Sequence, residues 1–142
     1  MGRLSGSIKT KDEMSGQVTR VAALLSETEH QLGFPYNGGT HGILRVAKHP
    51  RNGLTVTVRI DKGQITCHSF TRCRILVRFD DRPPIHFRGV EPSDGSADVV
   101  FLEPEAKFLK ELKKSTRVAV ELPFFQEGMR IFHFDTTNFK LD

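Results

Sequence analysis

The chain has 142 residues, of which 37% are hydrophobic and 27% are charged, and its formal net charge is +4. This length fits one ordinary hydrophobic core, so we expect a single domain over residues 1–142. The charged fraction is typical of a folded protein with a well-solvated surface, which argues against disorder. Because no apolar run reaches about eighteen residues, the sequence predicts no membrane span.

Residues 1–10 carry charges but no apolar stretch long enough for a signal peptide. We expect them to be poorly ordered, or to be a remnant of a leader or of cloning. Two interpretations follow. The chain is either a cytosolic protein with reduced thiols or a mature exported domain whose leader has been removed.

Short runs of β-forming residues, separated by turn residues, predict about eight strands. The clearest run begins at Leu54, where apolar and polar residues alternate as far as Ile60, a pattern typical of a half-buried strand. The expected strands cover residues 17–25, 41–47, 54–60, 74–79, 85–90, 97–102, 116–122 and 129–135. The first could equally be a short helix, and we favour a strand because Val18 and Val21 are β-branched. Strands at this spacing predict an antiparallel sandwich or barrel, and we favour a β-sandwich.

One short α-helix is expected near residues 104–114. Pro104 and Glu105 suit a first turn, Lys113 and Lys114 suit a last turn, and the residues between them include an apolar stripe. The helix should cover one end or one open face of the sheets. With eleven Phe, one Tyr and no Trp in the chain, we expect phenylalanine to fill the core.

The chain contains two cysteines, Cys67 and Cys73. They stand at the facing ends of two strand-like runs, 65–67 and 74–79, and a hairpin of these runs would bring the two thiols together. The spacing therefore predicts a disulfide that clips the hairpin. Such a bond is expected only in an oxidising compartment.

Metal-binding and catalytic motifs are missing from the sequence. The six histidines, with no HxH, HxxxH or HExxH pair among them, are His30, His41, His49, His68, His86 and His133. We therefore expect no metal and no cofactor. A cysteine paired with His68 is disfavoured as a nucleophile, because neighbouring residues of a strand point to opposite faces. Asp80 and Asp81 are interpreted as turn residues rather than as an acid and base pair.

The loop between residues 32 and 41 is the best candidate for binding. Phe34, Tyr36, Asn37 and His41 combine aromatic rings with polar groups beside several glycines, which suits an adaptable contact. The alternative is a long connector that Phe34 anchors in the core. For an enzyme we can nominate only Tyr36, His41 and Arg78, without a mechanism.

Several segments resemble a family of uncharacterised proteobacterial proteins that often carry a leader or a lipoprotein signal. The segments are GFPYNGG, RVAKHPRNG, LTVTVRIDKGQITC, VRFDD, PSDGSADVVFL, FLKELKKSTRVAVELPFFQEG and IFHFDTTNF. Their order is also similar, more distantly, to the periplasmic accessory protein of type VI secretion. The resemblance implies a periplasmic or envelope-associated β-sandwich in which Cys67 and Cys73 match the family's cysteine pair. It brings no catalytic residues, and this chain departs from it in lacking a leader and tryptophan.

Two functions remain in competition. The first, which we favour, is a non-enzymatic accessory module of the envelope that binds a protein partner, with a link to secretion. The second is a cytosolic protein of a phage or mobile element that binds nucleic acid or inhibits a host factor. Nucleic acid is not favoured, because the basic residues are scattered along the chain. The sequence is also compatible with a homodimer formed through exposed strand edges, and it does not decide between monomer and dimer.

Overall fold

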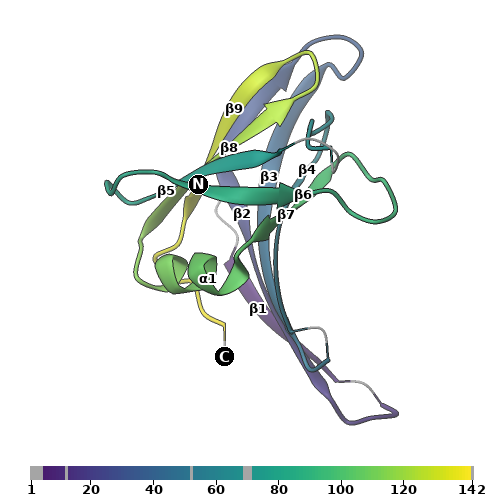
Figure 1. Ribbon diagram of the computed structural model, residues 1–142, viewed down its shortest axis with the longest axis vertical. Coiled ribbons are helices and arrows are strands. Elements are labelled where there is room, and N and C mark those ends of the chain that lie inside the picture. Colours follow the sequence, from purple (N-terminus) through teal and green to yellow (C-terminus); the bar gives the residue numbers. More distant parts are fainter. Residues whose placement is uncertain (1–4, 12, 52, 69–71, 142) are drawn as a thin grey trace.

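The computed structural model describes residues 5–11, 13–51, 53–68 and 72–141. These residues form one antiparallel sheet and one helix (Figure 1). The elements are β1 (Ser5–Lys11), β2 (Val18–Leu32), β3 (Gly38–His49), β4 (Gly53–Ile60), β5 (Arg74–Phe79), β6 (Ile85–Val90), β7 (Val99–Glu103), α1 (Glu105–Lys113), β8 (Arg117–Phe124) and β9 (Gly128–Asp135). The prediction of a mainly antiparallel β fold with one short helix near 104–114 is confirmed. No helix in the described part of the chain is long and apolar enough to cross a membrane.

The order of strands in the sheet is β1-β2-β3-β4-β7-β6-β5-β8-β9. This single sheet curls until β9, its last strand, lies beside β2, its second strand. The curling is what gives the fold its layers. β2 makes the closure possible because it is long: its first half pairs with β1, from Val18 to Leu24, and its second half lies along β9. The result is a nearly closed, barrel-like sheet with an inner and an outer face.

Side-chain groups, rather than a backbone ladder, join β2 to β9. The Nε2 atom of His30 donates to the carbonyl oxygen of Ile131 at 2.7 Å, and the N–H of His133 donates to Oγ1 of Thr28 at 3.0 Å. A register irregularity between Leu25 and Glu29 lets β2 leave β1 and turn toward β9. We call this junction the seam.

Phenylalanine fills the interior, as expected. Phe79, Phe87, Phe108, Phe132 and Phe134 are each no more than 1% exposed. The first three meet edge to face, with ring centroids 5.2 to 6.2 Å apart, an arrangement that aromatic quadrupoles favour.

Helix α1 packs against β4 and β7, while β1 and the hairpins of β2, β3 and β4 extend below it in Figure 1. Its apolar stripe, Phe108, Leu109 and Leu112, is buried. The turn between β5 and β6 lies against it, since a guanidinium N–H of Arg82 donates to Glu111 at 2.6 Å. The predicted role of the helix as a cover is confirmed.

Candidate functional site

The loop between β2 and β3 presents one aromatic ring to solvent and packs another inward. Phe34 is 87% exposed, whereas Tyr36 is partly buried against the core. The N–H groups of Tyr36 and Asn37 both donate to the carbonyl oxygen of Gly33, at 2.9 and 3.1 Å, so the loop is a tight turn. The alternative of a connector anchored by Phe34 is wrong, because Tyr36 provides the anchor.

The other two residues proposed for this loop hold it in place. His41 lies on β3, where its Nδ1 atom is 3.4 Å from Oδ2 of Asp61 and its N–H donates to the same oxygen at 3.1 Å. The carbonyl oxygen of Asn37 accepts from Nζ of Lys62 at 3.4 Å. Of the four predicted residues, Phe34 and Asn37 are exposed, whereas Tyr36 and His41 are partly buried.

Three further large apolar side chains are exposed at the same end of the molecule. Phe125 is 49% exposed in the turn between β8 and β9, and Met129 and Ile131 on β9 are 50% and 42% exposed. This turn touches the β2–β3 loop, because Gly33 N–H donates to Oε2 of Glu127 at 3.2 Å. The two loops lie together at the top of Figure 1. We call Phe34, Phe125, Met129 and Ile131 the apolar patch.

The patch continues along the outer face of the sheet into a shallow hollow. This hollow has a volume of about 220 Å³. Its lining combines the apolar residues Ile131, Leu76, Pro84 and Ala119 with the polar residues Arg78, Glu121 and His133. Strand alternation explains the arrangement: Phe132 and Phe134 point inward, so Met129, Ile131 and His133 must point outward. The apolar surface thus extends from the loops onto β9, β8 and β5.

The seam beside the patch holds a histidine in an unfavourable position for protonation. Burial lowers the pKa of His133 below its ordinary value of 6.5, and the Arg117 guanidinium lowers it further. The Glu27 carboxylate, 3.2 Å from Arg117, acts in the opposite direction, and His30 acts with Arg117. Nδ1 of His133 is buried and finds no hydrogen-bond partner in the described part of the chain.

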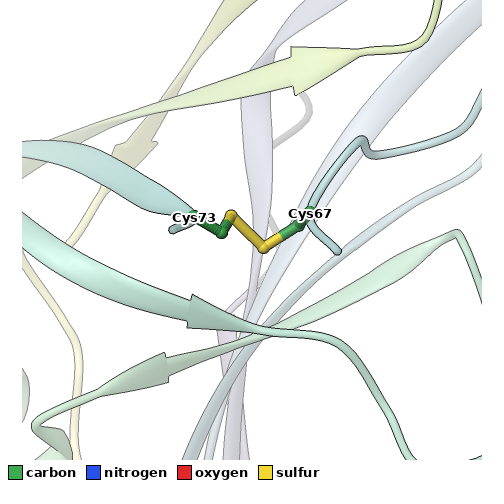
Figure 2. Close-up of a disulfide and its surroundings, with 2 residues drawn as sticks. All are labelled: Cys67 and Cys73. Atoms are coloured by element: carbon green, nitrogen blue, oxygen red, sulfur yellow. A yellow bond between two sulfur atoms is a disulfide. The ribbon is translucent and has the colours of Figure 1, made fainter. Parts of the chain in front are cut away.

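Cys67 and Cys73 form a disulfide, with their sulfurs 2.02 Å apart (Figure 2). The bond joins the segment after β4 to the start of β5. The expected hairpin is wrong, because Ile65 forms an isolated bridge with Phe124 and Thr66 N–H donates to the carbonyl oxygen of Pro123. The first arm therefore lies along the end of β8 instead of pairing with β5.

The residues nominated for catalysis have structural partners and lie on different elements. Arg78 donates from Nε to the carbonyl oxygen of Arg82 and from a terminal N–H to that of Asp81, so it supports the β5–β6 turn. His41 is bound to Asp61, and Tyr36 packs on the core. Within the described ranges, no group of three or more His, Cys, Asp or Glu side chains is arranged to hold a metal ion.

The sequence pattern already indicated that some residues of the apolar patch are exposed, but the interpretation that placed binding in the loop at residues 32–41 did not use this pattern. Phe124 and Phe125 are adjacent near the end of a strand, so they cannot both point inward. Phe124 is 4% exposed and Phe125 is 49% exposed. In β9, Met129 and Ile131 alternate with inward phenylalanines, so an outward apolar pair could have been read from the sequence.

A comparison of the chain with models of protein families, with curated proteins and with solved structures found no match. The function is therefore inferred from the chain's own geometry.

Proposed function

We propose that this protein is a non-enzymatic module of the cell envelope that recognises a protein partner through the apolar patch. The observation that carries the proposal is the exposure of four large apolar side chains, on two touching loops and one strand. Exposed apolar surface costs about 25 cal/mol per Å² relative to burial, and a contiguous patch of it marks a contact site. A partner that covers the patch would recover this free energy.

The shape of the site favours a protein over a small ligand. The hollow next to Ile131 measures about 220 Å³, which is below the range of roughly 300 to 1,000 Å³ for small-molecule sites. It suits one apolar side chain of a partner, while the patch itself offers a broad surface around it. Interfaces commonly combine such an anchor with a surrounding apolar surface.

The disulfide supports an extracytoplasmic location, because such bonds persist in oxidising compartments. The resemblance to exported proteobacterial proteins, and to a secretion accessory protein, points the same way. We therefore place the partner in the periplasm or at the membrane surface.

Photo-crosslinking in the native host tests the proposal. The crosslinker p-benzoylphenylalanine is placed at Phe34 and, as a matched control, at Met14, which is 94% exposed in the turn between β1 and β2. We expect a discrete adduct from position 34 alone, in the periplasmic or envelope fraction. With the crosslinked partner purified, F34S and M129S should each weaken binding about tenfold, as loss of a contact residue does. M14S should leave binding unchanged.

Two results would contradict the proposal. Equal adducts from both positions, or none from position 34, would remove the apolar patch as the docking surface. Free thiols at Cys67 and Cys73, measured by alkylation and intact mass on protein from the native host, would remove the envelope location.

A second candidate function is nucleic-acid binding in the cytosol. One observation favours it: Arg74 on β5 and Arg88 on β6 are exposed and directly opposite each other, which costs stability for two like charges. Glu103 pairs with Arg88 at 3.5 Å, so Arg74, which has no carboxylate partner among the described residues, is the charge that an external anion would neutralise. Fluorescence anisotropy with a labelled oligonucleotide would then show steeply salt-dependent binding that R74Q weakens. No binding at low salt would remove this candidate.

A further inference from the structure

A second hollow lies on the outer face of the sheet and includes no residue of the apolar patch. It spans β3, β4 and β7 and has a volume of about 420 Å³, which falls within the range of roughly 300 to 1,000 Å³ typical of small-molecule sites. The hollow exists because short side chains, Thr55 and Thr57, lie between long ones such as Arg45, Arg59 and Phe101.

The register of the three strands places basic and apolar side chains next to one another. Two rows cross the strands, Arg45, Thr57 and Phe101 in one and Ile43, Arg59 and Val99 in the other. Side chains directly opposite each other on neighbouring strands are separated by about 5 Å at Cβ. Each row therefore offers one guanidinium and at least one apolar side chain within reach of a single ligand.

The electrostatics of the hollow favour an anion. Its ionisable lining residues are Arg45, Arg59 and His49, and none is acidic. Among the described residues, neither guanidinium forms a hydrogen bond or an ion pair. The nearby acid, Asp94, is held by Ser96: hydrogen bonds from the Ser96 hydroxyl and N–H lower the pKa of Asp94, and Arg59 adds a smaller effect.

Hydroxyl groups form part of the floor between the arginines. Thr57 is 8% exposed, and its hydroxyl has no hydrogen-bond partner in the described part of the chain. Thr55 lies 3.5 Å from Nε2 of His49, measured from its Oγ1 atom. These groups can donate to an anionic oxygen bound between the guanidiniums.

We propose that this hollow binds a small organic anion, a carboxylate or a phosphate ester, whose charged group lies between Arg45 and Arg59 and whose apolar body lies on Phe101. Arginine suits both anions because its planar donors match their oxygen pairs, and Phe101 suits an aromatic or aliphatic body. The site does not depend on the apolar patch, so either proposal can fail alone.

Titration of the full-length, isotope-labelled protein by ¹H–¹⁵N NMR tests the proposal, with phenyl phosphate, benzoate, inorganic phosphate and benzyl alcohol as probes. We expect phenyl phosphate, benzoate or both to shift the amide signals of Ile43, Thr57 and Val99. R45Q and R59Q should each weaken that binding about tenfold, because each removes a charge-assisted contact. R72Q, at an exposed arginine that does not line the hollow, is the matched control and should leave it unchanged.

The probes separate the parts of the proposal. Binding of only one of the two organic anions identifies its charged group as the preferred one. Equal binding of inorganic phosphate and phenyl phosphate would overturn the role of Phe101, and equal binding of benzyl alcohol would overturn the role of the arginines. Unchanged affinity in R45Q and R59Q, with wild-type amide spectra showing that the variants are folded, would overturn the site itself. The absence of amide chemical-shift changes with every probe would also overturn the site.

Discussion

A methyl group placed on the α-carbon of Gly89 would lie 2.6 Å from Sγ of Cys67. Sγ of Cys73 would lie 2.7 Å from the same methyl group, because Gly89 lies on β6 beside Cys73, one position beyond the Arg74–Arg88 pair. The Gly89 N–H also donates to the carbonyl oxygen of Cys73 at 2.8 Å, so the backbone there cannot easily withdraw. Glycine at this position and the disulfide are thus coupled through space.

Gly89→Ala should destabilise the protein by about 1 to 3 kcal/mol, the usual cost of forcing one carbon into a packed core. Urea unfolding measures the loss. The same substitution in a C67A/C73A background should cost less, because alanine side chains lack the sulfurs that the new methyl group would meet. Equal costs in the two backgrounds would show that the clash is not with the disulfide.

Phe108→Ala should lower the free energy of unfolding by about 3 to 5 kcal/mol, since the ring is fully buried between Phe79 and Phe87. Lys107→Ala on the exposed side of α1 is the control and should change little. Chemical denaturation followed by circular dichroism compares the two variants. A small effect of the Phe108 substitution would mean that α1 does not anchor the sheet.

Asp80 should stabilise the fold only in its charged form. Its carboxylate accepts hydrogen bonds from the N–H groups of Thr116 and Arg117, at 2.8 and 3.0 Å, and the bond from Thr116 is the main cause that lowers the pKa of Asp80 below 3.8. A lowered pKa means that this stabilisation is present at neutral pH and is lost as pH falls below that value. Melting curves should therefore separate wild type from D80N at neutral pH and converge as the pH falls through the lowered pKa of Asp80.

Two controls accompany that measurement. Asp81→Asn changes the exposed neighbour and should leave the pH dependence intact. Asp80→Ala should lower the melting temperature more than D80N at neutral pH, because φ at Asp80 is +55°, a conformation that Asn tolerates and Ala does not. A D80N variant that melts like wild type at neutral pH would refute the role of the charge.

His133 should make the fold less stable in mild acid. Burial and Arg117 lower the pKa of His133 in the folded protein below 6.5. The unfolded chain therefore binds a proton at a higher pH than the folded chain does, and the free energy of unfolding falls as pH drops below 6.5. His133→Gln should reduce this fall, measured by urea unfolding between about pH 7.5 and pH 5. His86→Gln, exposed on β6, should not. An unchanged slope in His133→Gln would place the acid sensitivity elsewhere.

The sequence predicted the elements whose side chains alternate or form a helical stripe. β4, β5 and β8 were anticipated because their inward residues are apolar, and α1 because Phe108, Leu109 and Leu112 recur at helical spacing. The second half of β2, residues 27–32, was missed. Residues 27–31 have the polar sequence ETEHQ, so no alternation of apolar and polar residues identifies this segment as a strand.

The candidate sites were harder to predict, since they depend on contacts between distant segments. Arg45, Arg59 and Phe101 meet only because β4 pairs with β7 across the chain segment that forms β5 and β6. No local pattern specifies that pairing. The disulfide partners, by contrast, are close in the sequence, and their proximity was predicted although the hairpin proposed for it was wrong.

The seam has a consequence for the chain while it is being synthesised. Thr28 and His133 are 105 positions apart, so the second half of β2 leaves the ribosome long before β9 exists to lie beside it. During that interval its backbone edge is open to strands of other chains. The charged and polar residues Glu27, Glu29 and Gln31 discourage such pairing, as charges do on exposed strand edges. The polar side chains of residues 27–31 thus protect the nascent chain from aggregation until β9 closes the sheet.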